Sequence, residues 1–201
     1  MRKIILLIGF AMMFLGIKAQ EVLLDSAALS KEHMFNNLKE ALKDPDKVYK
    51  LDLSGHKLDS IPPDVFKLKN LQVLILRNNR LTEIPEEIGA LTHLTKLDMA
   101  RNNIVTVDPA LGKLVNLIIL DLDRNEIEML PKQIGKLVNL VEFDMWDNEL
   151  NDMPEEAKGM INLRKLTLEG IMMNQDTQDH ISALLPNTKI KFAPACTCHW
   201  E

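Results

Sequence analysis

Apolar and polar positions repeat with a fixed step between Val48 and Leu168. In the copy that begins at Leu71, Leu74 and Leu76 alternate with residues that face the other way, the period of two expected for a strand with one buried face. The pattern returns every 23 residues, and the copies begin at Val48, Leu71, Leu94, Leu117, Leu140 and Leu163. This self-similarity predicts a solenoid, because a single copy cannot bury its apolar side chains, whereas stacked copies share one core.

The copies carry variants of the pattern L-x-x-L-x-L-x-x-N-x-L, followed in the clearest ones by I-P-x-x-I-G-x-L. The combined pattern resembles the leucine-rich repeat family, in its short 23-residue class. The resemblance implies an α/β fold: a right-handed horseshoe with a parallel sheet on its concave side. The first copy has a cap without cysteine, and the chain has no Asn-x-Ser/Thr sequon. These features, with a short apolar leader, are similar to those of small exported bacterial repeat proteins of the Bacteroidetes type.

One asparagine follows the strand in each of the four central copies. Its expected task is structural, because an amide inside a turn can satisfy backbone groups that the bend leaves unpaired. In the family that this chain resembles, the column forms an asparagine ladder. His56 and Ile171 replace the asparagine in the first and last copies, and the ladder itself consists of Asn79, Asn102, Asn125 and Asn148.

Residues 1–19 are typical of a secretory signal peptide. A basic start is followed by an uncharged apolar run from Ile4 to Ile17, and Ala19 is a small residue suited to cleavage. The alternative is an uncleaved membrane anchor, although the run is short for a span of about 20 residues. Removal of three basic residues with this segment changes the formal charge from −5 to −8. The mature chain is therefore expected to be secreted or periplasmic, not membrane-embedded, and too acidic to favour nucleic acid.

The two ends of the repeat array, residues 48–168, are expected to be capped. Residues 20–47 predict an N-terminal helical cap, with one helix over about 26–43. Residues 169–192 predict a C-terminal cap made of a helix capped by Asp176 and a last strand over 188–192. The tail, residues 193–201, carries Cys196 and Cys198, for which a strained or intermolecular disulfide, free thiols and a metal site all remain open.

The sequence contains no catalytic constellation, phosphate-binding loop or zinc motif, so we expect neither an enzyme nor a cofactor. What remains is a surface for a protein partner. The predicted binding residues are those that the strands and the following turns place on the concave face: Ile75, Arg77, Asp98, Arg101, Ile119, Asp121, Asp123, Arg124, Glu142, Asp144, Trp146 and Asp147.

Two features of this face suggest the partner's chemistry. Asp98, Asp121 and Asp144 share one column, where like charges are unfavourable, and the neighbouring Arg101 and Arg124 are their expected counter-charges. Trp146 lies at a strand's solvent side, where it gains nothing from the core. We therefore expect a partner with a basic and apolar patch, bound near the fourth and fifth copies. Alternatives are a structural or envelope-associated protein without a dedicated ligand, and a cation or small-ligand binder that uses the aspartate column.

Overall fold

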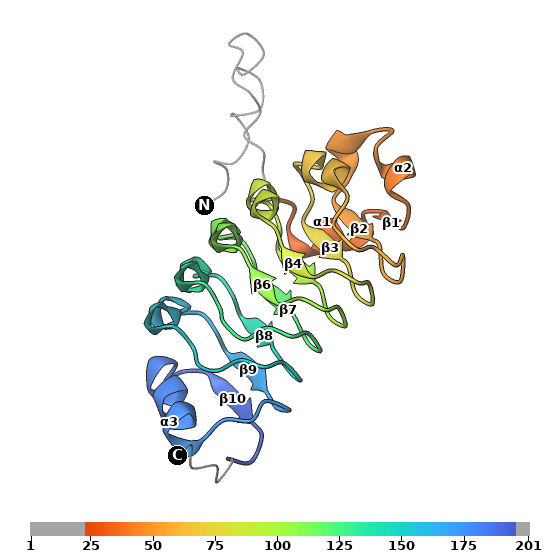
Figure 1. Cartoon of the computed structure of the whole chain (residues 1–201). Coiled ribbons are helices and arrows are strands. Elements are labelled where there is room, and N and C mark those ends of the chain that lie inside the picture. Colours follow the sequence, from red (N-terminus) through yellow and green to blue (C-terminus); the bar gives the residue numbers. More distant parts are fainter. Residues whose placement is uncertain (1–22, 196–201) are drawn as a thin grey trace, which may run out of the picture.

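The computed structural model describes residues 23–195 and shows a stack of repeats built around one parallel sheet. The sheet has eight strands in the order β1-β2-β3-β5-β7-β8-β9-β10 (Figure 1). The predicted repeat solenoid of the α/β class is therefore confirmed. The expected signal peptide at residues 1–19 and the two cysteines, Cys196 and Cys198, lie outside the described residues.

Each repeat contributes one short strand to this sheet at the same register. Lys50, Val73, Lys96, Ile119, Glu142 and Lys165 are aligned across neighbouring strands, so the sequence step of 23 becomes a stack of equivalent side chains. The strands are β2 (Lys50–Asp52), β3 (Val73–Ile75), β5 (Lys96–Asp98), β7 (Ile119–Asp121), β8 (Glu142–Asp144) and β9 (Lys165–Leu168).

The opposite wall of the solenoid consists of short 3₁₀ helices, one for each inter-strand connection. They are η2 (Pro63–Lys67), η3 (Glu86–Ala90), η4 (Pro109–Lys113), η5 (Lys132–Lys136) and η6 (Glu155–Gly159). A two-stranded sheet of β4 (Glu83–Ile84) and β6 (Thr106–Val107) precedes two of them. The helices pack closely: at Gly135, a side chain would collide with the backbone carbonyl of Glu156, so glycine is required there.

The leucines predicted to point inward form one continuous core. Leu74, Leu97 and Leu120 are completely buried at equivalent positions of three consecutive strands. The fifth copy fills its part of this core differently: methionines take positions where the second copy has leucine or isoleucine, and these are Met145, Met153 and Met160.

A left-handed residue closes the turn after each strand. Non-glycine residues adopt this conformation in the four central copies, with φ between 54° and 58°, although it is costly for L-residues. The column consists of Gly55, Asn78, Arg101, Arg124, Asp147 and Gly170. Three residues predicted to bind a partner, Arg101, Arg124 and Asp147, therefore also have a conformational task in the turn.

The asparagine column forms the ladder implied by the resemblance. Asn102 is buried, with only 8% of its surface exposed. Its Nδ2 donates to the carbonyls of Met99 at 2.8 Å and Leu76 at 3.1 Å. Its Oδ1 accepts from the backbone N–H of Leu81 at 3.1 Å, in the preceding turn. The same contacts recur at Asn79, Asn125 and Asn148. Each amide thus fixes its own turn and ties it to the turn before.

The N-terminal cap differs from the single helix predicted for residues 26–43. It contains α1 (Ser26–Lys31), β1 (Met34–Phe35), α2 (Leu38–Ala41) and the 3₁₀ helix η1 (Pro45–Lys47). The helix breaks because Glu32 is extended and β1 pairs in parallel with β2, while Asn37 starts α2 by accepting from the N–H of Glu40. Pairing of β1 covers the open edge of the sheet, and this is more favourable than continuing the helix for two more turns.

At the other end, α3 (Gln175–Leu184) and β10 (Lys189–Phe192) lie where the sequence predicts a helix and a strand. The predicted N-cap is wrong by two residues: Asn174, not Asp176, accepts from the N–H of Thr177. His180 of α3 contacts the carboxylates of Asp152 and Glu155 and so attaches the helix to the preceding repeat. Between residues 23 and 195, no helix combines the length and apolar character needed to cross a membrane.

The ladder yields a stability prediction. Substitution of Asn102 by Ala leaves buried carbonyls and the Leu81 N–H without their partner, so the free energy of unfolding should fall by about 2–4 kcal/mol. The neighbouring Asn103 is exposed, and its side chain donates to the exposed carboxylate of Glu126, so Asn103→Ala should cost less than about 0.5 kcal/mol. Urea titrations followed by circular dichroism compare the two variants; equal losses would contradict a ladder-specific role.

Candidate functional site: the sheet face and a lateral groove

The solvent side of the strands and of the turns after them forms a surface that we call the sheet face. The register places Asp98 opposite Asp121, and Asp121 opposite Asp144, so the predicted aspartate column is real. Its neighbours in the same row are Ile75 on one side and Thr167 on the other. The structure therefore brings the central part of the predicted binding set onto one surface.

Each aspartate of this column also has a local structural task that the sequence analysis missed. Asp98 Oδ1 accepts from the N–H of Ala100 at 3.2 Å, and Asp144 Oδ1 accepts from Trp146 at 3.0 Å. Asp121 bonds Asp123 in the same way at 3.1 Å. A carboxylate that accepts from the backbone two residues later is a common turn device. The sequence signal for this role was that each aspartate lies two residues before a residue of the following turn.

The counter-charge of the column is Arg77, and not Arg101 or Arg124 as predicted. The guanidinium of Arg77 reaches across the strands: Nη1 lies 3.3 Å from Asp121 Oδ2 and 3.7 Å from Asp98 Oδ1. Nη2 lies 3.3 Å from Asp123 Oδ1. The last contact is electrostatic rather than a directed hydrogen bond, because no donor within the described chain meets hydrogen-bond geometry at Asp123 Oδ1.

Asp98 and Asp123 are buried, with 7% and 9% exposure, so they are poorly placed to meet a partner directly. Burial, followed by the charge of Asp121, raises the pKa of Asp98 above its ordinary value. The same two causes raise the pKa of Asp123 to about 6, although Arg77 acts in the opposite direction. Asp98 and Asp123 therefore support the other side chains of the sheet face and are not expected to contact a partner.

The Asp123 carboxyl predicts how stability changes with pH. Its pKa is higher in the folded chain, at about 6, than the ordinary 3.8, so the fold favours the protonated form. The contribution of this carboxyl to the free energy of unfolding is fully present below pH 4 and is lost as the pH rises through about 6. Asp123→Asn should therefore unfold like the parent near pH 4 and be more stable at pH 7, by about 1–3 kcal/mol.

The matched control is Asp147→Asn, at an exposed position of the next turn. The measurement is the difference in unfolding free energy between each variant and the parent, from urea titrations between pH 4 and 7. A difference for Asp123→Asn that does not change with pH would show that this carboxyl is ionised throughout the range.

Trp146 is half-buried rather than exposed, and one face of its ring already carries a cation. The guanidinium carbon of Arg124 lies 4.4 Å from the ring centroid, and the backbone N–H of Arg124 donates to the carbonyl of Trp146 at 2.7 Å. A partner's cation that stacks on Trp146 must therefore use the part of the ring that Arg124 leaves accessible, or displace Arg124. Arg124 and Trp146 are a preassembled pair on the sheet face.

The sheet face carries a net positive formal charge in the second and third copies and a net negative one in the next two, and Arg77 modifies this contrast. The guanidinium of Arg77 pairs with Asp121 and Asp123 of the fourth copy, which lowers the charge difference between the two parts of the sheet face. On the sheet face, the exposed acids of the fifth copy are Glu142 and Asp147, and Lys165 Nζ lies 3.9 Å from Glu142 Oε2. Half-buried Ile119 and exposed Arg101 complete the predicted set. Within residues 23–195, no group of three or more His, Cys, Asp or Glu side chains is placed to hold a metal ion.

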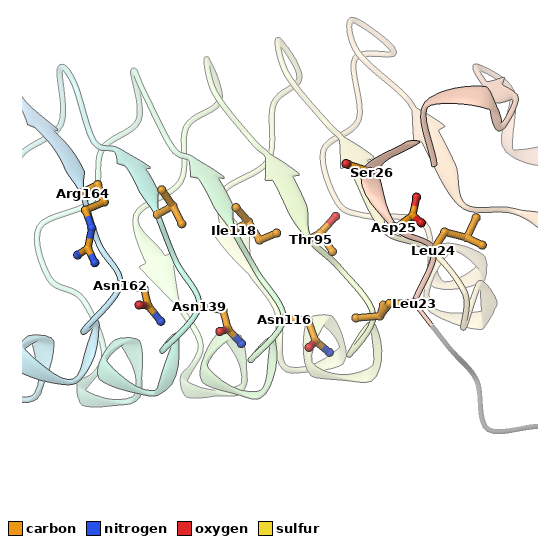
Figure 2. Close-up of a pocket in the computed structure, with 11 residues that line it drawn as sticks. Leu23, Leu24, Asp25, Ser26, Thr95, Asn116, Ile118, Asn139, Asn162 and Arg164 are labelled. Carbon is orange, nitrogen blue, oxygen red and sulfur yellow. The ribbon is translucent and has the colours of Figure 1, made fainter. Parts of the chain in front are cut away.

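A second surface, which we call the lateral groove, lies where the chain enters each strand. Figure 2 shows Asn116, Asn139 and Asn162 in one row and Thr95, Ile118 and Arg164 in a second. Val141 completes the second row, and Leu23 to Ser26 form one end of the groove. Sequence analysis did not single out this surface, although its positions recur with the same step of 23.

Comparison with known proteins agrees with this geometry. The leucine rich repeat family model matches residues 46–104 and 92–150, which together cover just over half of the chain. A solved leucine-rich repeat protein of Leptospira interrogans is similar, with a TM-score of 0.68 and 30% sequence identity over 81% of this chain. This chain covers 47% of that one, so it spans about half the length of its structural relative. No curated protein gives a significant match.

The stacked parallel strands, the ladder and the family match define a non-enzymatic repeat module of the kind that mediates protein–protein interactions. The chain belongs to the leucine-rich repeat family.

Proposed function

We propose that the protein is exported and binds another protein through the part of the sheet face formed by the fourth and fifth copies. The observation that carries this proposal is the pair of Arg124 and Trp146 on the solvent side of the strands, with the ring centroid 4.4 Å from the guanidinium. An indole at this place is only half-buried and contributes little to the core. Tryptophan and arginine are the residue types most enriched among binding hot spots.

The charges around this pair suggest the partner's chemistry. Glu142, Asp144 and Asp147 lie in the same copy as Trp146, and none of them is among the carboxylates held by Arg77 in the part of the chain that the structure describes. Arg77 stiffens the adjoining part of the aspartate column by ion pairs that cross from the second copy to the third and fourth. A rigid acidic surface beside an aromatic ring suits a partner with a basic and apolar patch.

The test begins with recovery of partners by the mature domain, residues 20–201, followed by binding kinetics with a purified partner. Trp146→Ala should weaken binding mainly through a faster off-rate, by about tenfold or more, because a packed aromatic anchor is lost. Met129→Ala is the control, because Met129 is 72% exposed and lies outside the sheet face. Parent-like kinetics for Trp146→Ala would place binding elsewhere on the molecule.

Export rests on the charged start and apolar run of residues 1–19, which precede the described chain. We expect cleavage after Ala19, which yields a secreted or periplasmic protein that begins at Gln20. N-terminal sequencing of the protein from the extracellular or periplasmic fraction checks this expectation. Recovery of exported protein that still begins at Met1 would identify the segment as a retained anchor.

A further inference from the structure

The lateral groove carries an exposed aliphatic stripe on a side of the solenoid that the sheet face does not include. Seven large hydrophobic side chains are exposed in the described part of the chain, and four of them either line the groove or directly precede a residue that lines it. Ile118, at 44% exposure, lines the groove, and the other three directly precede its asparagines: Val115, Val138 and Ile161. The last three recur at one repeat position, so exposed aliphatic side chains are concentrated along this side of the solenoid rather than scattered.

The protein itself shows how a peptide segment rests on this side. Gln72 occupies the same repeat position as Ile118, two copies nearer the N-terminus, and is only 1% exposed. Its Oε1 accepts from the backbone N–H of Leu24 at 2.9 Å, and its Nε2 donates to the carbonyl of Leu24 at 3.0 Å. The N-terminal segment therefore covers the column at the second copy. In the next three copies the equivalent residues are Thr95, Ile118 and Val141, which line the groove and are at least partly exposed.

The asparagine row gives the floor of the groove a polar component at regular intervals. The Nδ2 groups of Asn116 and Asn139 donate to the carbonyls of Thr92 at 2.9 Å and Val115 at 2.8 Å, and Asn162 makes the equivalent bond to Val138 at 2.8 Å. These bonds fix the side chains and leave each amide oxygen as an acceptor for a peptide N–H. Aliphatic contacts between fixed acceptors suit a main chain with apolar side chains.

The far end of the groove is cationic. Arg164 is exposed and donates from Nη1 to the carbonyls of Ile161 at 3.3 Å and Leu163 at 3.2 Å, which fix the guanidinium at the groove wall. No carboxylate of residues 23–195 forms an ion pair with it. At the opposite end, Asp25 is committed to α1, because its Oδ1 accepts from the N–H of Ala28 at 2.8 Å. The fixed free cation is complementary to a carboxylate.

We propose that the lateral groove is a second binding site, and that it takes an extended segment of a partner protein with aliphatic side chains and one carboxylate. The aliphatic side chains lie on Ile118 and Val141, and the carboxylate pairs with Arg164. Three inter-strand steps separate Thr95 from Arg164, about 15 Å, which an extended peptide covers with four or five residues. This site is separate from the sheet face and does not depend on the partner proposed there.

The test uses the mature chain, residues 20–201, and two fluorescein-labelled peptides: acetyl-Leu-Thr-Leu-Thr-Leu-Glu-amide and its variant with Lys in place of Glu. Fluorescence anisotropy should show saturable binding of the Glu peptide and binding of the Lys peptide that is at least about tenfold weaker, which corresponds to about 1.4 kcal/mol. Arg164→Glu should reverse this preference, so that the Lys peptide binds better. Ile118→Asn should weaken both peptides.

The control is Val105→Asn, which replaces an aliphatic side chain of similar exposure, 48%, outside the groove and should leave binding unchanged. Thermal unfolding verifies that each variant is folded. Failure of both peptides to bind, or an Arg164→Glu variant with unchanged preference, would overturn the proposal. Concentration-dependent dimerisation of the parent that Ile118→Asn abolishes, in sedimentation experiments, would assign the groove to a second copy of this chain and would also overturn it. Trp146→Ala should bind the peptides normally, so this result is independent of the sheet-face proposal.

Discussion

The fold depends on one buried asparagine amide in each of the four central turns. A chain that reverses direction every few residues leaves carbonyls and N–H groups pointing inward, and these are costly to bury without partners. Asn102 satisfies three such groups, and two of them belong to the preceding copy. The leucines supply most of the burial, but they are tolerant of exact shape, whereas the amide fixes the geometry. The strands of the central copies align at a constant register because their turns are closed in the same way.

That constant register explains why the sheet face could be predicted. Once the step of 23 residues is known, the alignment of Asp98, Asp121 and Asp144 follows from sequence alone. The partner of the column could not be found in the same way. Arg77 reaches carboxylates one and two copies away, and that reach depends on its rotamer and on strand spacing rather than on any repeat position. Periodicity predicts where residues lie in the stack, but not which long side chain spans it.

The N-terminal cap was harder to predict for a different reason. The segment before Val48 contains no repeat, so only helical periodicity was available, and it suggested one continuous helix. In the structure the open edge of the sheet competes with the helix for the same backbone, and Met34 and Phe35 pair with β2 instead. Gln72 then holds Leu24 on the lateral side. Both contacts link the cap to residues far away in the sequence, which a local pattern does not record.

The methionines of the fifth copy give the two ends of the solenoid different chemical durability. Leucine and isoleucine are inert to oxidants, whereas a thioether is converted to a polar sulfoxide. Met145, Met153 and Met160 belong, with Phe143, to the buried core, so oxidation of one would place a polar oxygen among apolar side chains. Exposed Met129 and Met172 meet an oxidant first and consume it. In an oxidising environment, the C-terminal repeats are therefore where chemical ageing of this protein begins.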